Sequence, residues 1–373
     1  MPKRLAVIGH PLAAEENRMA FRDWKGFEID LVVPRIWKSR SLGHTYRMRG
    51  DSQGRSARVG RPEVHALDTY GGGRNSLFLW RGLGPLLRRL RPDAIYCWEE
   101  PWCLSTWQIG RLARNLGVPL VFYTAENRPK RLPWPFSALQ ERAFRSCAAC
   151  VAPTAEIADR IRLSGFTGAL FTVPLWILPR RRLPADAQGR CLAYVGRLIP
   201  LKRVHLLVES LKLLPDFRLR VIGDGPERPR LAALASELGL SDRVDFRGHL
   251  DNRDLEAGLE GASLLVLPTG ENPLQAEQFG KAALEGVSCG LPVLASRTGN
   301  LAVLAESVST LTALDLDSAE QMAAAVTGLF RDYPDPDALE ESRIRVQEYF
   351  GPASAGRRLE AAFASLFPGA GAP

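Results

Sequence analysis

The run Leu192-Ala193-Tyr194-Val195-Gly196-Arg197 joins a short apolar segment to a glycine and then to a cation. Four apolar residues without polar alternation predict a strand that is buried on both faces, as in a parallel sheet. Residues 204–214 have helical spacing, so the run opens a βα unit. Ligands of open parallel sheets bind beyond the carboxyl ends of the strands, which places Gly196 and Arg197 where a ligand would be held.

The same alternation extends along the chain in both directions. Residues 40–76 interrupt it, because they are rich in Arg, Gly and Ser, and we expect a long irregular connection there. That connection carries the basic residues Arg47, Arg49, Arg55 and Arg58. Further strands are predicted at 5–9, 29–33, 94–97, 119–123, 150–152, 219–222, 244–246, 264–267 and 293–295, and helices at 84–90, 105–116, 228–238, 254–259, 279–288 and 352–367.

Length and composition indicate how many domains the chain contains. At about 100–200 residues per domain, 373 residues with 46% hydrophobic content predict two domains with separate cores. Segment 176–189 is polar and contains two prolines, which is typical of a linker. We therefore expect two Rossmann-like α/β domains that face each other across a cleft, an N-terminal one at 1–175 and a C-terminal one at 190–350, with a tail helix at 351–373 that returns to the first.

Charge is distributed unevenly along the chain. Residues 1–180 hold 28 lysines and arginines against 15 acidic residues, a net charge of +13, whereas the remainder holds 21 against 26, a net charge of −5. The first half is expected to meet a membrane surface, a phosphorylated acceptor or nucleic acid, unless the excess only reflects an arginine-rich composition. Nucleic acid is the least favoured of these, because no basic motif is interleaved with aromatic residues.

The sequence also indicates the compartment and the absence of a metal. No apolar run approaches the roughly 18 residues of a membrane-spanning helix, and the N-terminal apolar run is too short for a signal peptide. The six cysteines are scattered, and Cys147 with Cys150 has no second pair to complete a zinc site. The five histidines lack metal-ligand spacing. We expect a cytoplasmic protein with reduced thiols, with peripheral membrane contact as one option, and neither a metal nor a cofactor.

Two positive side chains follow the strand at 192–195. Arg197 and Lys202 suit a diphosphate, the first through forked hydrogen bonds and the second as a point charge. After the next strand comes Gly223-Asp224-Gly225-Pro226-Glu227-Arg228, which begins like a dinucleotide-binding fingerprint but lacks its third glycine. The sequence therefore argues against a dehydrogenase, and it predicts a tight turn at Gly223 ahead of a helix that begins near Pro226.

Two glutamates, Glu277 and Glu285, stand eight residues apart. Eight residues of helix rise about 12 Å, so both carboxylates could border one ligand. Backbone N–H groups near Gly280 and Lys281 would begin a helix, where phosphate binds readily. Glu285 has apolar neighbours inside the predicted helix and needs polar partners, which two ribose hydroxyls would supply.

Together these motifs resemble the C-terminal donor domain of the GT4-type glycosyltransferases, which have the GT-B architecture. They occur in the order and spacing of that family between residues 191 and 300. The matching stretches are Val195-Gly196-Arg197 with Lys202, Gly223-Asp224-Gly225-Pro226, Val244 with Phe246 and Gly248, Leu267-Pro268, and Glu277 with Phe279-Gly280, Glu285-Gly286 and Gly290-Leu291-Pro292-Val293.

The resemblance implies a metal-independent enzyme that retains the anomeric configuration. Its co-substrate would be a nucleotide sugar, UDP-linked by family frequency. Arg197 and Lys202 would bind the diphosphate and stabilise the leaving phosphate in place of a metal. Glu277 would contact the donor sugar, and Glu285 would hold the ribose. The loop Arg247, Gly248, His249 and Leu250 would line the base pocket, with further donor contacts at Gly196, Gly223, Phe279, Gly280 and Lys281.

The N-terminal half is expected to bind the acceptor. It departs from the family at two loops, where Gly9-His10-Pro11-Leu12 replaces a double-glycine loop and Ala125 or Glu126 stands where relatives often carry a histidine. Acidic residues at neighbouring strand ends in a basic domain suggest that Glu100 and Glu126 take part in catalysis. The expected acceptor contacts are His10, Arg18, Glu100, Trp102, Glu126 and Asn127.

The predicted function is therefore transfer of a sugar to a glycan, a lipid-linked acceptor or an anionic small molecule. Two alternatives fit the same scaffold. An epimerase acting on nucleotide sugars would need no acceptor. A non-catalytic subunit that binds nucleotide sugar is favoured by the departures of the N-terminal loops from the family.

Overall fold

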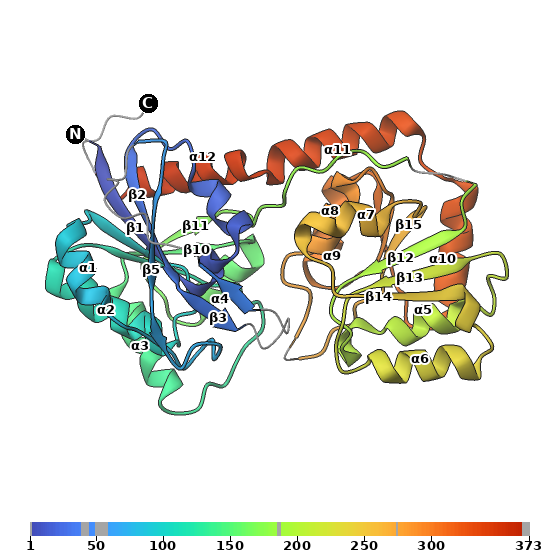
Figure 1. The fold of residues 1–373 in the computed structure, drawn as a ribbon, viewed down its shortest axis with the longest axis horizontal. Coiled ribbons are helices and arrows are strands. Elements are labelled where there is room, and N and C mark those ends of the chain that lie inside the picture. The colour runs from blue at the N-terminus through green and yellow to red at the C-terminus, as the bar shows by residue number, and fades with distance from the viewer. Residues whose placement is uncertain (1, 39–44, 49–58, 185–187, 274, 368–373) are drawn as a thin grey trace. The chain divides into compact units, whose positions relative to one another are not determined.

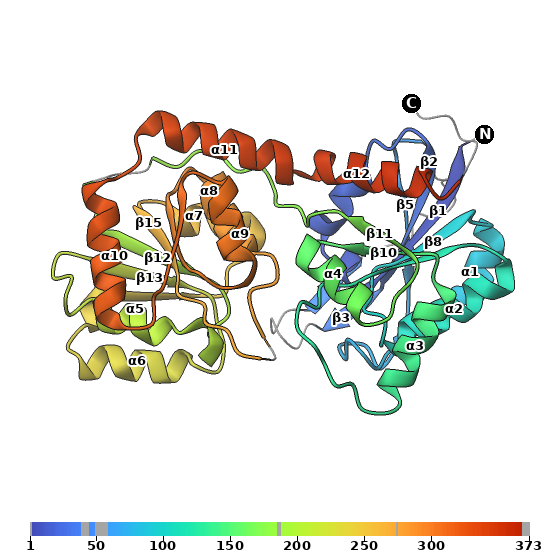
Figure 2. The same cartoon turned by 180° about the vertical axis from the view of Figure 1, so that it is seen from behind.

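The computed structural model describes residues 2–38, 45–48, 59–184, 188–273 and 275–367. The chain divides into two compact units, residues 1–176 with 352–373 (unit 1) and residues 177–351 (unit 2). Each unit is built on one parallel sheet with helices on both faces, which Figures 1 and 2 show from opposite sides. The predicted fold class, α/β with two Rossmann-like sheets, is confirmed. No helix of the described ranges is both long and apolar enough to cross a membrane.

Unit 1 contains seven parallel strands in the order β11-β10-β9-β8-β1-β2-β5. The chain first builds β1, β2 and β5 toward one edge, then returns to the other side of β1 and adds β8 to β11. The strand order therefore reverses between β1 and β8, which is the switch point of the sheet. The strands are β1 Lys3–Ile8, β2 Phe27–Pro34, β5 Glu63–Leu67, β8 Ala94–Cys97, β9 Leu120–Tyr123, β10 Ala149–Ala152 and β11 Ala169–Thr172.

Two apolar clusters cover the faces of this sheet. One includes Leu87, Ile109 and Phe144, which come from α1, α2 and α3. The other includes Phe21 and Phe363, because the C-terminal helix α12 packs against the 3₁₀ helix η2. The helical elements of unit 1 are η1 His10–Ala13, η2 Glu15–Phe21, α1 Leu83–Leu90, α2 Leu104–Leu116, α3 Phe136–Ser146, α4 Ala155–Leu163 and α12 Pro352–Ala364.

The irregular connection predicted at residues 40–76 is wrong in part, because this segment contains strands. β4 (Thr45–Arg47) pairs antiparallel with β3 (Ile36–Lys38), β6 (Thr69–Tyr70) pairs with β7 (Leu79–Trp80), and β5 extends the main sheet. These strands are short or half-buried, so their stability comes from partners elsewhere in the chain. Arg47 is exposed on β4, and Arg49, Arg55 and Arg58 lie outside the described residues.

Unit 2 contains six parallel strands in the order β14-β13-β12-β15-β16-β17, so its switch point lies between β12 and β15. Its strands are β12 Cys191–Val195, β13 Arg218–Ile222, β14 Val244–Gly248, β15 Leu264–Leu267, β16 Val293–Ser296 and β17 Leu311–Leu314. Its helical elements are η3 Pro200–Lys202, α5 Val204–Ser210, α6 Arg228–Glu237, η4 Ser241–Arg243, η5 Asn252–Asp254, α7 Leu255–Leu259, α8 Lys281–Ser288, α9 Gly299–Ser307, α10 Ala319–Arg331 and α11 Pro336–Phe350.

Candidate functional site

Three segments of unit 2 meet at its switch point. Lys202 ends η3, which follows β12, and Thr269 follows β15. The Lys202 ammonium donates to Glu277 Oε2 over 2.6 Å and to Thr269 Oγ1 over 3.3 Å. The side chains of Lys202 and Glu277 are 23% and 20% exposed, so a ligand can reach the pair. The structure therefore brings together two of the residues predicted to bind the donor.

Arg197 and a glycine turn at Gly223 follow the neighbouring strands β12 and β13. The Arg197 side chain is exposed, and its guanidinium has no ion-pair partner among the described residues. Gly223 has a φ of 145°, and a Cβ there would lie 1.8 Å from the carbonyl oxygen of Gly196. Only glycine therefore allows the ends of β12 and β13 to approach this closely. The Gly223 N–H donates to the carbonyl of Gly248 over 2.8 Å, which ties the predicted base-pocket loop to the same turn.

Glu277 and Glu285 do not lie on one helix, in contrast to the arrangement predicted from their spacing. Helix α8 begins at Lys281, so Glu277 lies in the loop before it and the 12 Å helical rise does not apply. Glu277 Oε1 instead accepts the backbone N–H of Gly280 over 3.2 Å, just ahead of the helix. The predicted helix N-terminus near Gly280 is confirmed, because Gly280 is the residue that precedes α8.

Glu285 is buried in α8, and the sequence gave no sign of one of its partners, Arg180. Arg180 Nη2 lies 3.9 Å from Glu285 Oε1, and Lys281 Nζ lies 3.7 Å from the same oxygen. Arg180 is 5% exposed and also donates to the carbonyl of Asn252 over 2.6 Å. Its place in the run Arg180-Arg181-Arg182 of a polar segment gave no sign of burial. The described part of segment 176–189 is therefore not simply a solvated linker.

The remaining predicted donor residues differ in their accessibility. Arg247 forms an ion pair with Asp245, and His249 is exposed with Asp251 at 4.0 Å. Phe279 is buried and packs on Phe350 with ring centroids 5.9 Å apart, so its side chain belongs to the core. Leu250 is half-buried.

In unit 1, two adjacent glutamates after β8 reach in opposite directions. Glu100 accepts the hydroxyl of Thr124 over 2.6 Å and the N–H of Ala125 over 2.9 Å, so it binds the loop after β9. Burial raises the pKa of Glu100 to about 7. Glu99 turns instead toward the end of β1 and contacts His10 Nδ1 over 2.7 Å. The sequence predicts a role for Glu100 but gives no sign of the role of Glu99, because the direction in which neighbouring loop side chains point is not visible in a sequence.

Several other residues predicted to contact the acceptor already form contacts with residues of unit 1. Glu126 Oε1 accepts the N–H of Arg128 over 3.2 Å, and its other oxygen pairs with Lys130. That ammonium lies 5.1 Å from the centroid of the Trp102 ring. Asn127 is buried. Arg18 donates to the carbonyl of Leu12 over 3.3 Å, and burial lowers its pKa.

One group of potential metal ligands comes together in unit 1, although the sequence spacing gave no sign of it. Ligand atoms of Asp30, Glu63 and His65 lie within 4.8 Å of one another, because β2 and β5 are neighbours. The Arg4 guanidinium lies 3.0 Å from Asp30 and already supplies a positive charge there. These residues lie within the strands and not beyond their carboxyl ends, so they are separate from the switch point.

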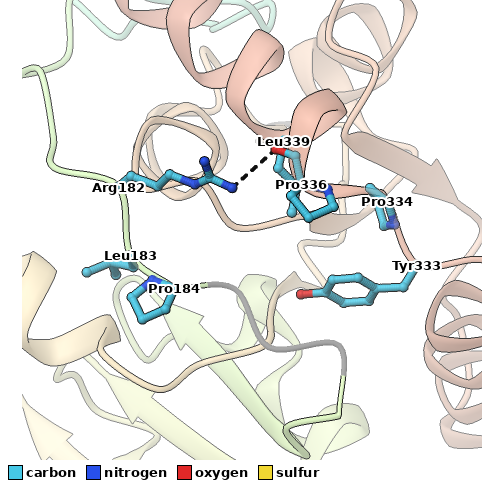
Figure 3. A pocket seen from close by; sticks show the side chains of 7 residues that line it. All are labelled: Arg182, Leu183, Pro184, Tyr333, Pro334, Pro336 and Leu339. Atoms are coloured by element: carbon cyan, nitrogen blue, oxygen red, sulfur yellow. Dashed lines mark hydrogen bonds between the residues drawn. The ribbon is translucent and has the colours of Figure 1, made fainter.

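A hollow of about 480 Å³ in unit 2 is also separate from the candidate site (Figure 3). Arg182 donates across it to the carbonyl of Pro336 over 3.2 Å. It contains none of the charged residues of the switch point and connects the start of unit 2 with the region between α10 and α11. Its lining residues are Arg182, Leu183, Pro184, Tyr333, Pro334, Pro336 and Leu339.

Solved structures of similar fold match nearly the whole chain. Anabaena Alr3699/HepE in complex with UDP has a TM-score of 0.69 at 16% identity, over 97% of this chain and 100% of that chain. Sucrose-phosphate synthase from Thermosynechococcus elongatus has a TM-score of 0.69 at 17% identity, over 98% of this chain and 99% of that chain. At such identities the likeness shows the fold.

Curated relatives are similar over shorter stretches. A D-inositol 3-phosphate glycosyltransferase from Thermobispora bispora is 32% identical over 193 residues, 48% of this chain and 44% of the relative. The lipopolysaccharide core biosynthesis glycosyltransferase LpsE from Rhizobium meliloti is 26% identical over 257 residues, 66% of this chain and 68% of the relative. The chain thus spans less than half of the D-inositol 3-phosphate glycosyltransferases that it matches.

Two family models cover the two units. The model described as Glycosyl transferases group 1 matches residues 179–346, and the model described as Glycosyl transferase 4-like domain matches residues 23–176. Both matches agree with the parallel-sheet architecture, and the first includes the residues at the switch point of unit 2. The chain therefore belongs to the GT4-type glycosyltransferase family with the GT-B architecture.

Proposed function

We propose that this protein transfers a sugar from a UDP-linked donor to a hydroxyl-bearing acceptor, with retention of anomeric configuration and without a metal ion. The observation that carries the proposal is the cluster at the switch point of unit 2, where Lys202 and Glu277 form an accessible ion pair in the same sheet-edge region as Arg197. Guanidinium and ammonium groups suit the two phosphates of such a donor. The similar fold of HepE, whose structure was solved in complex with UDP, supports the choice of nucleotide.

In this proposal, different residues of unit 2 contact different parts of the donor. Arg197 and Lys202 stabilise the charge that builds up on the departing diphosphate, a role that fixed cations perform in place of a metal. When the donor binds, Glu277 exchanges part of its contact with Lys202 for a sugar hydroxyl. Glu285, positioned by Arg180, accepts the ribose hydroxyls.

Unit 1 binds the acceptor in the same proposal. The residues proposed to face it follow the carboxyl ends of β1, β8 and β9, where parallel sheets hold their ligands. An anionic acceptor is supported by the net charge of +13 in residues 1–180 and by the names of the D-inositol 3-phosphate glycosyltransferases. The proposed contacts are His10, Arg18, Glu100, Trp102, Glu126 and Asn127.

A thermal-shift screen of nucleotide sugars tests the donor site. A ligand at one hundred times its Kd adds about 2.7 kcal/mol of stability. The variants Arg197→Ala and Lys202→Ala should each weaken binding about 10- to 100-fold, because each removes a charged hydrogen bond worth about 1.5–3 kcal/mol. Lys212→Ala is the matched control, since Lys212 is an exposed lysine of the same unit. Equal stabilisation of all four proteins by UDP-sugars would contradict the proposed donor site.

Product analysis then separates transfer from its alternatives. Incubation with the donor alone should leave the sugar unchanged, whereas an epimerase would convert it without an acceptor. With an acceptor present, NMR of the new glycosidic bond should show the anomeric configuration of the donor. Inverted product would refute retention while leaving the donor site intact. A chelator should not reduce the rate.

Peripheral contact with an anionic membrane is a separate part of the proposal. Helices α2 and α3 border a groove of about 890 Å³ whose lining includes Arg111, Arg114, Arg142 and Arg145. Arg145 pairs with Glu141 over 3.1 Å, and the described residues that line the groove include no acidic one. Flotation with vesicles of anionic phospholipid should recover the protein at low salt and release it at high salt. Failure to bind at low salt would remove this part of the proposal.

A further inference from the structure

Three large apolar side chains are exposed beyond the carboxyl end of the sheet of unit 1. Ile36 is 44% exposed, Tyr70 is 61% exposed and Leu77 is 48% exposed. Ile36 follows the last residue of β2, and Tyr70 follows β5, in a sheet where β1, β2 and β5 are neighbours. We call these three side chains the apolar patch. Open parallel sheets bind their ligands beyond this end of the strands, so the patch lies where unit 1 would hold a ligand.

The turn between Tyr70 and Leu77 packs against the strand that carries Ile36. A Cβ at Gly72 would lie 3.8 Å from the carbonyl oxygen of Ile36. At Gly71, φ is 74° and a Cβ would lie 2.6 Å from the carbonyl oxygen of Leu77, so glycine allows the chain to fold back on itself here. The three members of the patch are therefore joined by backbone contacts, although they come from two separate segments.

The packing beneath the patch fixes its backbone. Ile36 and Leu77 are each followed in the chain by a buried aromatic residue. These residues, Trp37 and Phe78, are 2% and 0% exposed, and their ring centroids lie 4.9 Å apart. Because successive residues of a strand point to opposite faces, the burial of Trp37 leaves Ile36 at the surface. Trp37 also stacks on His10 with ring centroids 4.5 Å apart, which connects the patch to a proposed acceptor contact.

Positive side chains share the face of the β3–β4 ladder that carries Ile36. Arg47 is the direct partner of Ile36 in the antiparallel register, and Lys38 stands two residues from Ile36. Side chains alternate along a strand and face their cross-strand partners, so all three lie on one face. Lys38 and Arg47 are exposed, and neither forms an ion pair with another described residue. Arg74 is also exposed in the adjacent turn.

We propose that unit 1 binds an amphiphilic acceptor, with a hydrocarbon chain on the apolar patch and an anionic head group beside Lys38 and Arg47. The inference rests on the proposed glycosyl transfer and narrows its acceptor to the lipid-linked class. A water-soluble anion would leave the patch in contact with water. A neutral glycan would leave the cations without a counter-charge, since segments 35–38, 45–48 and 69–81 contain no acidic residue.

Binding of alkyl phosphates to the full-length protein tests the inference without a donor. Titration calorimetry compares inorganic phosphate with octyl phosphate below its micelle concentration. Octyl phosphate should bind about 10- to 100-fold more tightly, the gain expected when about two or three methylene groups leave water. Octyl maltoside has the same chain without the charge and should bind more weakly than octyl phosphate, because it makes no charge-assisted contact with the cations.

Substitutions then assign the two parts of the ligand to the two parts of the surface. Leu77→Ser should weaken octyl phosphate binding about 5- to 20-fold and leave inorganic phosphate binding unchanged. Lys38→Gln should weaken the binding of both phosphates. Leu163→Ser is the matched control, since Leu163 is 80% exposed at the end of α4 in the same unit and should bind as wild type.

Two binding results would overturn the inference. One is octyl phosphate that binds no more tightly than inorganic phosphate, or equally well to Leu77→Ser and Leu163→Ser. The other is binding of anionic phospholipid vesicles that Leu77→Ser abolishes, without any binding of monomeric octyl phosphate, because the patch would then contact a membrane surface.

Transfer assays separate the inference from the proposed function. Two acceptors that share a head group, one with an alkyl chain and one without, are compared with a UDP-sugar as donor. Leu77→Ser should raise KM for the alkyl acceptor alone, with kcat and UDP binding unchanged. Equal KM values of the wild-type protein for both acceptors would overturn the inference and leave the transferase function intact. A protein that binds octyl phosphate as expected but neither binds nor uses a UDP-sugar would instead refute the proposed function.

Discussion

Replacing Glu100 by glutamine should change how the stability of unit 1 depends on pH. Glu100 is half-buried between the ends of β8 and β9, where its carboxylate accepts hydrogen bonds from Thr124 and Ala125. Glutamine has the same shape, keeps an oxygen for the Ala125 N–H, and cannot ionise. The substitution therefore removes the titration of this site while it preserves most of the contacts.

The size of the effect follows from the pKa. Burial raises the pKa of Glu100 from 4.5 to about 7, although the hydrogen bonds from Ala125 and Thr124 act in the opposite direction. The folded protein keeps a proton that the unfolded chain releases, so this stabilisation is complete below pH 4.5 and is lost as the pH rises through 7. At about 1.4 kcal/mol per pH unit, the loss is on the order of 3 kcal/mol, most of it between pH 5 and pH 8. The Gln variant should lack this loss.

Urea unfolding followed by tryptophan fluorescence gives the measurement. All eight tryptophans lie in unit 1, so the signal reports that unit alone. From pH 5 to pH 8, the unfolding free energy of Glu100→Gln should rise by about 2–3 kcal/mol relative to wild type. Parallel curves, within about 0.5 kcal/mol at both pH values, would show that Glu100 holds no proton in the folded protein. Transfer assays on the same variant test the predicted catalytic role, which an unchanged rate would argue against.

Three further variants test other parts of the structure. Gly223→Ala should weaken UDP binding at least about tenfold, because its Cβ would lie 1.8 Å from the Gly196 carbonyl, whereas Gly239→Ala meets nothing within 4 Å and should bind as wild type. Arg180→Met should lower the melting temperature and weaken UDP binding, because it leaves the buried Glu285 with one cation fewer. The control is Arg181→Met, which changes an exposed arginine. Equal behaviour of the two variants would contradict the role of Arg180. Phe363→Ala should cost unit 1 about 3–5 kcal/mol in the tryptophan assay, since the ring is buried against Trp24 and Tyr96, and a loss below about 1 kcal/mol would mean that α12 contributes little to the core.

The sheets were predictable from the sequence because buried parallel strands leave a local pattern. The predicted strands at 94–97 and 264–267 coincide with β8 and β15, since a run of apolar residues between polar turns is sufficient to identify a strand buried on both faces. The strand β5 was missed because its residues are mostly half-buried at the sheet edge. Such a strand shows no continuous apolar run and depends on β2, which lies far away in the sequence.

The donor-site motifs were likewise visible as local patterns, but side-chain partners were not. The sequence identified Lys202 and Glu277 separately, and only the fold shows that their charged atoms are 2.6 Å apart. Arg180 was expected to belong to a solvated run, yet its guanidinium is buried near Glu285. In each case the contact joins segments far apart in the chain, so spacing and composition carry no information about it.

Each of the two units contains a carboxylate that holds a basic side chain in place. The two carboxylates differ in how exposed they are to a ligand. Glu99 holds His10 in unit 1, and Glu277 holds Lys202 in unit 2, so in both units a basic side chain is oriented before a ligand arrives. Such orientation reduces the reorganisation required during the reaction. Glu99 is almost fully enclosed, whereas Lys202 and Glu277 are both about one-fifth exposed. A donor can therefore compete for the Lys202–Glu277 contact, while an acceptor can reach only the outer nitrogen of His10 and must leave its contact with Glu99 in place. We expect donor binding to separate the first pair and acceptor binding to preserve the second.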